Sequence, residues 1–213
     1  MKTDDLVAML ATGAGPVPRR AASRRLSAAL LVGVPMSFAW MLYEFGMRRD
    51  LIEAMFWPMF WVRIVLPICV AIAGFVVLQR LARPGARVRK AWLGLAVPLV
   101  VIWVIAAVIL MSSPAEERPT LIWGQTWRTC ALNIAMISLP VFVGALIALK
   151  GLAPTRPALA GAAAGAMGGG AGAAVYALHC PELAAPFIAI WYVAGILLPV
   201  AAGALIGPRL LRW

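Results

Sequence analysis

The sequence predicts an all-α, polytopic membrane protein built as a six-helix transmembrane bundle. Two features of composition lead to this fold class. Of the 213 residues, 63% are hydrophobic and only 13% are charged, about half the charged share of a typical soluble domain. The mean hydropathy is +0.92. A third feature is the presence of six almost charge-free runs, each near the roughly 20 residues that a helix needs to cross a bilayer.

The six expected spans divide the chain into a short leading segment and a membrane domain. The spans cover approximately residues 26–43, 64–79, 91–111, 129–149, 157–178 and 185–206. The first run is too long for the apolar region of a signal peptide and lacks a cleavage site, so we expect it to remain as a span. Before the second, Arg63 is expected to extend its guanidinium to the outer surface. Residues 26–213 would then form the membrane domain and residues 1–25 the main extramembrane segment.

Cationic residues are distributed unequally between the two sides of this expected bundle. Six spans place both termini on one side, and that side carries 14 of the 19 Lys and Arg residues but only 2 of the 8 Asp and Glu residues. The positive-inside rule therefore predicts that both termini are cytoplasmic, an N-in/C-in orientation in a bacterial inner membrane. The net charge of +11 then reports orientation and requires no direct nucleic-acid partner.

The spans are poor in the polar groups that chemistry in a membrane requires. Ionisable side chains within the hydrocarbon mark proton relays and substrate paths, and these runs hold almost none. Asn133 and Ser138 are the main exceptions, and one interhelical hydrogen bond is expected for each. A single histidine excludes a bis-histidine haem held by this chain alone, and no nucleotide-binding or zinc-protease motif is present. The sequence does not indicate an enzyme.

The fifth span is unusually rich in glycine and alanine. Gly161, Gly165 and Gly169 recur every four residues and share one helix face. Small residues at this spacing let two helix backbones approach closely, which predicts either the packing axis of the bundle or the seam of a homodimer. The other five spans each contain a proline, so a small transporter or exporter subunit is the alternative class of function, although prolines are tolerated in membrane helices generally.

The three cysteines fall in two different settings. Cys69 lies within the second span and is expected to be a small buried hydrophobe. Cys130 and Cys180 lie at the outer ends of spans four and five, at heights that differ by roughly 6 Å. The outer side of a bacterial inner membrane is oxidising, so these thiols are candidates for a structural disulfide or for a redox or metal switch, while two unrelated buried thiols are the third alternative. His179 adds a candidate ligand for a transient heavy-metal ion at Cys130 and Cys180; no other cofactor is expected.

The first residues predict a short amphipathic helix. Thr3 can cap it, and Asp4 and Asp5 lie in its first turn, where the helix dipole favours anions. Leu6, Met9 and Leu10 form its apolar face, and the glycines and prolines at positions 13, 15, 16 and 18 end it. A helix this short is not stable alone in water. Its acidic and apolar faces suit a partner protein; contact of the arginines of the segment with membrane lipid is the alternative.

Several motifs, taken in order, resemble those of the NrsF-like six-pass membrane anti-sigma factors. They are the opening MKTDDLVAML, the CALNI run leading to SLP, the RPALAGAAAG of the fifth span, LHCPE followed by F-x-A-x-W-Y, and the terminal RLLRW. The resemblance implies that residues 1–25 bind an extracytoplasmic-function sigma factor and hold it at the membrane. It also implies that Cys130 and Cys180 are needed to release that factor under heavy-metal or oxidative stress.

Overall fold

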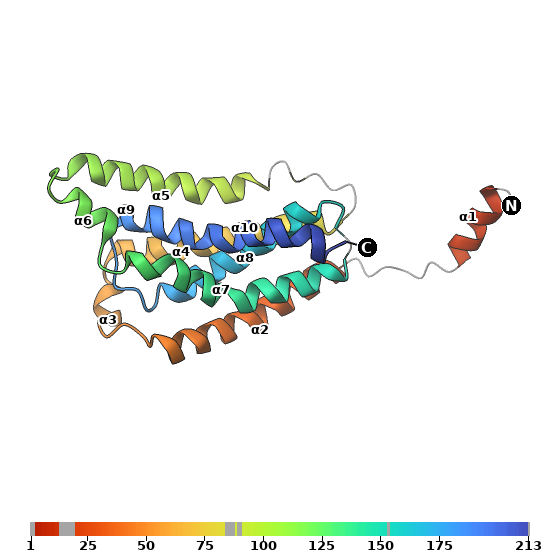
Figure 1. Ribbon diagram of the computed structural model, residues 1–213, viewed down its shortest axis with the longest axis horizontal. Coiled ribbons are helices and arrows are strands. Elements are labelled where there is room, and N and C mark those ends of the chain that lie inside the picture. The colour runs from red at the N-terminus through yellow and green to blue at the C-terminus, as the bar shows by residue number, and fades with distance from the viewer. Residues whose placement is uncertain (1–2, 13–19, 84–87, 89–90, 153, 213) are drawn as a thin grey trace.

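The computed structural model describes residues 3–12, 20–83, 88, 91–152 and 154–212, and within these ranges all regular structure is helical. Six helical segments are long and apolar enough to cross a membrane. They form one elongated bundle, with α1 (Thr3–Thr12) standing apart from it at one end (Figure 1). The six-helix fold class is confirmed. The expected charges at positions 2, 19, 87, 89 and 90, the glycines and prolines at 13–18, and Trp213 lie outside the described residues.

The observed spans are close to the expected ones but mostly longer. They are α2 (Ala21–Glu44), α4 (Pro58–Leu81), α5 (Leu93–Ser112), α7 (Trp127–Lys150), α8 (Pro157–Tyr176), and the continuous helix formed by α9 (Ala185–Phe187), a π-helical turn (Ile188–Tyr192) and α10 (Val193–Leu210). Two short helices, α3 (Leu51–Ala54) and α6 (Arg118–Trp123), lie in connections. The largest difference concerns the second span, which begins at Pro58 rather than at residue 64. Proline suits the first turn of a helix because the N–H groups of that turn have no acceptor within the helix, so the N–H that proline lacks is not needed there.

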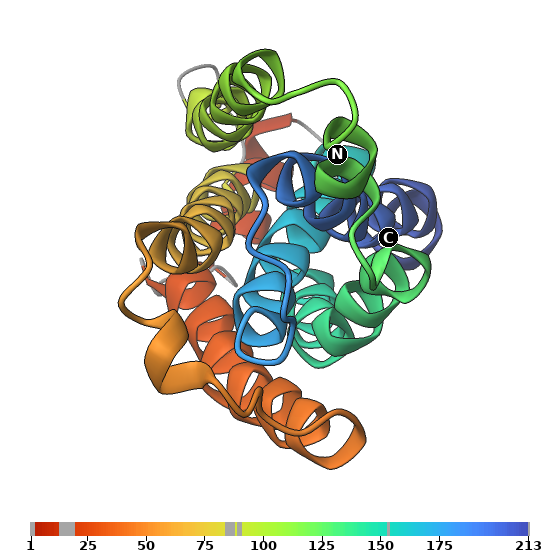
Figure 2. The ribbon, with the colours of Figure 1, turned by 90° about the vertical axis from the view of Figure 1, so that its left-hand side faces the viewer.

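The bundle is built around α8, which α4, α7 and α10 surround (Figure 2). Its glycines explain how closely these helices approach. A Cβ added at Gly161 or Gly165 would clash with the backbone carbonyl of Gly203 or Pro199 in α10, and one added at Gly172 would lie 2.7 Å from the Cα of Ser138 in α7. The predicted glycine face is therefore a packing axis within the chain, between α8 and α10.

Helix α5 lies at the edge of the bundle (Figure 2) and buries only Ile102 and Ala106. A π-helical turn widens the helix and leaves backbone carbonyls available to other donors. In the turn at Ile188–Tyr192, the indole of Trp103 in α5 donates a 3.1 Å hydrogen bond to the carbonyl of Ala189, and the indole of Trp191 donates one of 2.9 Å to Ile122. These bonds attach α5 and α6 to the last span.

Two of the expectations for single side chains are wrong. Cys69 is exposed on the outer surface of α4 rather than buried, because that face of α4 is turned away from α8. The hydroxyl of Ser138 donates to the carbonyl of Ala135 in its own helix, at 2.6 Å, and makes no interhelical bond that the structure records. The prediction for Asn133 is confirmed, since its amide donates to the hydroxyl of Tyr176 in α8 at 3.4 Å.

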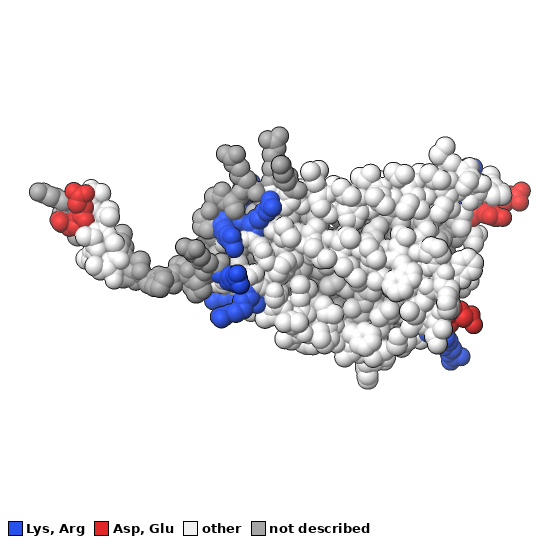
Figure 3. Space-filling view, turned by 180° about the vertical axis from the view of Figure 1, so that it is seen from behind, with Lys and Arg blue, Asp and Glu red and all other residues white. Residues whose placement is uncertain are grey.

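The two ends of the bundle differ in charge. We call the end where α2 begins and α10 finishes the tail end, and the opposite end the cysteine end. Figure 3 shows most Lys and Arg side chains grouped at the tail end, and carboxylates on α1 and, beside some further cations, at the far end. The described cations of the tail end are Arg20, Arg24, Arg25, Arg80, Arg83, Lys150, Arg156, Arg209 and Arg212. The separation of charge expected from the sequence is therefore present in space.

Candidate functional site

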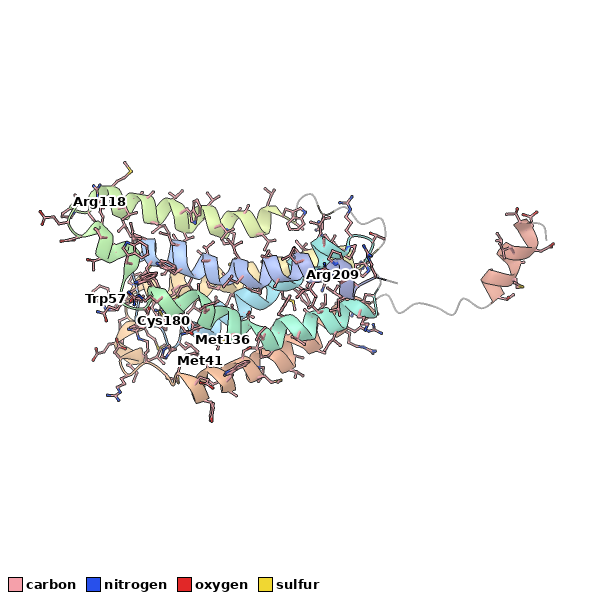
Figure 4. All side chains as sticks on the ribbon, in the orientation of Figure 1. Met41, Trp57, Arg118, Met136, Cys180 and Arg209 are labelled. Atoms are coloured by element: carbon pink, nitrogen blue, oxygen red, sulfur yellow. The ribbon has the colours of Figure 1, made fainter. Side chains whose placement is uncertain are left out.

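Cys130 and Cys180 come together at the cysteine end of the bundle. Cys130 lies in the first turn of α7, and Cys180 lies in the connection between α8 and α9, which we call the outer loop (residues 177–184). Both side chains are completely buried, and both thiols are free. Both cysteines belong to one buried cluster and share Thr126 as a neighbour. The backbone N–H of Cys130 donates to the carbonyl of Thr126 at 3.0 Å, and the hydroxyl of Thr126 lies 4.0 Å from the sulfur of Cys180. Figure 4 shows Cys180 at the end of the bundle opposite Arg209.

The outer loop is fastened to the start of α7 by the carboxylate of Glu182. One carboxylate oxygen of Glu182 accepts hydrogen bonds from the backbone N–H groups of Gln125 and Thr126, at 2.6 and 3.2 Å. These N–H groups lie at the N-terminal end of α7, where backbone N–H groups point out of the helix and the helix dipole favours an anion. Gly124 lets the carboxylate approach, because a Cβ at this position would lie 2.7 Å from it.

Arg63 fastens the same loop from the side of α4. One guanidinium nitrogen (Nη1) donates to the carbonyls of Cys180 and Glu182, at 2.6 and 2.5 Å, and the other (Nη2) donates to the carbonyl of Ala177 at 2.7 Å. Ala177 directly follows α8 as its C-cap, where the helix dipole favours a cation. The side chain is 0% exposed, so the expectation that Arg63 extends to the outer surface is wrong. The carbonyls of the outer loop offer the guanidinium its hydrogen bonds inside the protein.

A second arginine, Arg48, reaches the loop from the connection between α2 and α3. Its guanidinium forms two hydrogen bonds with the carboxylate of Asp50, at 2.8 and 2.6 Å, and a longer one of 3.3 Å with the carbonyl of Cys180. The hydrogen bond from Arg48 lowers the pKa of Asp50 to about 2, and the same bond raises the pKa of Arg48. Arg48 therefore enters the site with its charge already paired, whereas no carboxylate pairs with Arg63 among the residues that the structure describes.

The surroundings of Cys180 favour the thiolate form of its side chain. The neighbouring Cys130 thiol is the main cause of a lowered pKa of the Cys180 thiol, and the backbone N–H of Glu182 and the charge of Arg63 act in the same direction against the effect of burial. A thiolate is the form that binds soft metal ions and attacks oxidants. Chemically, the arrangement offers two neighbouring buried thiols, and the pKa of one of them is lowered.

His179 does not join the two thiols. Its ring nitrogen Nδ1 lies 3.0 Å from the carbonyl of Gly46, and its ring packs against those of Phe45 and Tyr176, with centroids 5.2 and 5.6 Å away. Within the described ranges, no three His, Cys, Asp or Glu side chains are grouped closely enough to hold a metal ion. The candidate metal ligands Cys130, Cys180 and His179 are thus not grouped together in this conformation. Only the two thiols remain as candidate ligands at this site.

The N-terminal residues lie far from this site. Thr3 is the first described residue of α1, which carries Asp4 and Asp5 in its first turn and is described as far as Thr12. The side chains of Asp4, Leu6 and Met9 are exposed, and that of Leu10 lies outside what the structure describes. Helix α1 projects beyond the tail end, opposite the cysteine end (Figure 1). The residues expected to bind a partner are thus available on an isolated helix.

Sequence reasoning missed the residues that hold the outer loop in place. Arg63 was expected only to extend to the outer surface, and neither Glu182 nor Thr126 was singled out. The sequence did contain one indication of the position of Arg63, which is the sixth residue of a helix that starts at Pro58. A proline that suits a first turn marks this start, and would have placed the arginine well within the helix.

Comparison with known proteins provides an independent view of the chain. The family model described as "Negative regulator of sigma F" matches residues 10–213. A probable anti-sigma-F factor NrsF from Azospira oryzae is 46% identical over 213 residues, covering 100% of both chains. The anti-sigma-F factor NrsF of Caulobacter vibrioides is 38% identical over 214 residues, again covering 100% of both. No solved structure matches this chain.

Proposed function

Because this chain belongs to the family of negative regulators of sigma F, we propose that it is a membrane-bound anti-sigma factor that sequesters an extracytoplasmic-function sigma factor. The family is regulatory and non-enzymatic, in agreement with the expectation that the chain is not an enzyme. The observation that carries the proposal is the match over the whole membrane domain. The acidic, exposed α1 at the tail end of the bundle supports it further.

The sigma factor binds to residues 1–25 in this proposal. Asp4 and Asp5 meet cationic groups of the partner, and Leu6, Met9 and Leu10 fill an apolar groove on it, a common mode of recognition for a short amphipathic helix. Binding supplies the packing that a helix of ten residues lacks alone. The membrane domain then acts as the anchor that keeps the sigma factor away from the transcription machinery.

The proposed orientation places the tail end in the cytoplasm of a bacterial cell and the cysteine end outside the inner membrane. The cations grouped at the tail end support this orientation through the positive-inside rule. Membrane lipid surrounds the apolar outer surface. A homodimer remains a prediction, and the glycine face of α8 is not available for it because α10 covers that face.

The proposed signal acts on Cys130 and Cys180. A heavy-metal ion bound by both sulfurs, or a disulfide between them, changes the packing of α7 against the outer loop and leads to release of the sigma factor. The burial of both thiols in one cluster, each in contact with Thr126, supports this step. To act at a distance, the event must favour one of two states of the bundle, typically by about 1–3 kcal/mol.

The first test removes residues 1–12 from the full chain. We expect the partner sigma factor, expressed together with the truncated chain, to leave the membrane fraction and to activate a reporter gene constitutively. The matched control replaces Glu116 and Glu117, exposed carboxylates at the cysteine end, with glutamine and leaves binding unchanged. Unchanged co-purification of the sigma factor with the truncated chain contradicts the proposal.

The second test replaces one thiol at a time. Cys130→Ser and Cys180→Ser are each expected to leave repression intact and to abolish induction by cadmium or by an oxidant, whereas Cys69→Ser, at an exposed position on α4, keeps the normal response. A normal metal and oxidant response in either site variant shows that the sensor lies elsewhere.

The alternative function, a small transporter or exporter subunit, finds less support. A transporter binds its substrate in a polar cavity near the middle of the membrane. The groove of about 880 Å³ between α2, α4 and α8 is instead lined by apolar side chains such as Leu31, Phe38 and Ile72, and it lies open at the side of the bundle.

A further inference from the structure

Arg63 holds an unusual position for a charged residue in a membrane bundle. Its side chain is 0% exposed, and no carboxylate within the described ranges forms an ion pair with it. Burying an ion without a counterion is expensive unless hydrogen bonds replace its hydration. Arg63 meets this cost with three carbonyl partners, and all three belong to the outer loop or to the end of α8.

The three carbonyls lie on both sides of Cys180 in the sequence. Ala177 precedes it, Glu182 follows it, and the carbonyl of Cys180 itself is the third acceptor. The loop backbone is therefore gathered around one guanidinium. The guanidinium is planar and its N–H donors have fixed directions, so it determines the positions of the three carbonyls. The flexible ammonium group of a lysine would not do so.

Other groups fix the remaining sides of this arrangement. Glu182 is held in turn by the N–H groups at the start of α7, the helix that carries Cys130. The Arg63 guanidinium also lies over the ring of Phe60, 5.4 Å from its centroid, an arrangement that stabilises a cation. Its Nε is buried without a hydrogen-bond partner among the described residues, so the side chain is held in place by its two terminal nitrogens and by this ring.

We infer that Arg63 is the positioning residue of the thiol site: its hydrogen bonds to the outer loop hold Cys180 against Cys130 and keep the pair able to react together. This inference rests on the proposed function only in the role that it gives the two thiols as a sensor. The adjacency of the thiols is chemical and can be measured without a sigma factor.

The test measures how fast the two thiols form a disulfide in the full chain in membranes. All variants carry Cys69→Ser, so that only Cys130 and Cys180 react. The oxidant is diamide, which takes two electrons and two protons from the two thiols as the sulfur–sulfur bond forms and is itself reduced to the hydrazine. Loss of free thiols is followed over time with a maleimide of high mass on a gel.

We expect Arg63→Met to slow disulfide formation by at least about tenfold, the factor that corresponds to losing one strong hydrogen bond to a charged group. Arg63→Lys is expected to be intermediate, because an ammonium keeps the charge but not the planar set of donors. The matched control is Arg48→Met, which removes the 3.3 Å contact with the Cys180 carbonyl and the ion pair with the exposed Asp50 but leaves the three Arg63 bonds in place. It is expected to stay within about twofold of the parent.

Several outcomes overturn the inference. Arg63→Met that reacts at the rate of the parent shows that the loop keeps its shape without the guanidinium. Arg63→Lys at the parent rate beside a slow Arg63→Met shows that charge alone suffices. A parent chain that forms no disulfide between Cys130 and Cys180 removes the adjacency on which the inference depends.

A second measurement separates misfolding and the proposed function from this inference. Each variant is tested for co-purification of the partner sigma factor, which is expected to be unchanged because residues 1–25 lie at the other end of the bundle. A slow Arg63→Met that has also lost the sigma factor is globally disrupted, and the inference then fails. If the parent oxidises rapidly but neither thiol is needed for induction in cells, the sensing role is wrong while the positioning role of Arg63 stands.

Discussion

The contact between α8 and α10 gives the sharpest prediction for stability. At Gly165, a Cβ would clash with the Pro199 carbonyl and lie 2.5 Å from the Cα of Val200. These neighbours are backbone atoms, which cannot rotate away as a side chain does. Ordinary contact begins at 3.4 Å, so Gly165→Ala requires the two helices to separate by roughly 1 Å, enough to lose about half of the dispersion energy of the affected contacts.

The magnitude follows from two opposing terms. Overpacking of a well-packed core costs about 1–3 kcal/mol, and replacing glycine by alanine within a helix returns up to about 1 kcal/mol. We therefore expect Gly165→Ala to lower the free energy of unfolding by about 1–2 kcal/mol. For a chain of this size the corresponding fall in Tm is roughly 2–8 °C.

The assay is thermal unfolding in detergent, followed by the fluorescence of the tryptophans. The matched control is Gly94→Ala in α5, where a Cβ would lie 3.2 Å from the methyl group of Ala73 and meets no other helix backbone more closely than 4.0 Å. Gly94→Ala is expected to keep or slightly raise the Tm. Equal Tm values for the two variants refute the argument that the backbone contact at Gly165 limits the packing.

Two further predictions concern the cysteine end. Glu182→Gln removes the charged acceptor of the Gln125 and Thr126 N–H groups and is expected to lower stability by about 1 kcal/mol, whereas Glu116→Gln, in an exposed turn, leaves the same unfolding curve unchanged. Since the pKa of Asp50 in the folded chain, about 2, lies below its ordinary value, the contribution of the Arg48–Asp50 pair is present above about pH 4 and is lost as the pH falls toward 2. Arg48→Met is expected to return that pKa to its ordinary value, as NMR titration of labelled aspartate measures; an unchanged low pKa rules out Arg48 as the cause.

The parts of the fold that were predicted correctly depend on local sequence. The length and hydropathy of each run determine whether it can cross a membrane, and the spacing of Gly161, Gly165 and Gly169 places them on one face whatever the rest of the chain does. The choice between a packing axis and a dimer seam was not local. It depends on whether α10 of the same chain covers the face, and only the structure shows that it does.

The candidate site was predicted in part for the same reason. Cys130 and Cys180 end neighbouring antiparallel spans, so their similar heights could be estimated from residue counts. Residue counts place His179 at the same height as Cys180. Its ring nevertheless does not join the two thiols, because it packs against Phe45 and lies beside the Gly46 carbonyl. The direction in which a side chain points at a helix end depends on such partners, which are distant in the sequence. Neighbouring residues in the sequence therefore do not predict it.

Arg63 is the clearest case of a side chain whose role depends on distant partners. Near a membrane surface, a lone arginine usually extends to water because no alternative exists in lipid. Here the alternative is supplied by carbonyls 114 to 119 residues further along the chain. Once they are present, extending the side chain into water leaves those carbonyls buried and unpaired, at a cost comparable to that of burying the arginine itself. The guanidinium and the outer loop are therefore stable in this form only together, which is why a change at either one is expected to reach the thiols.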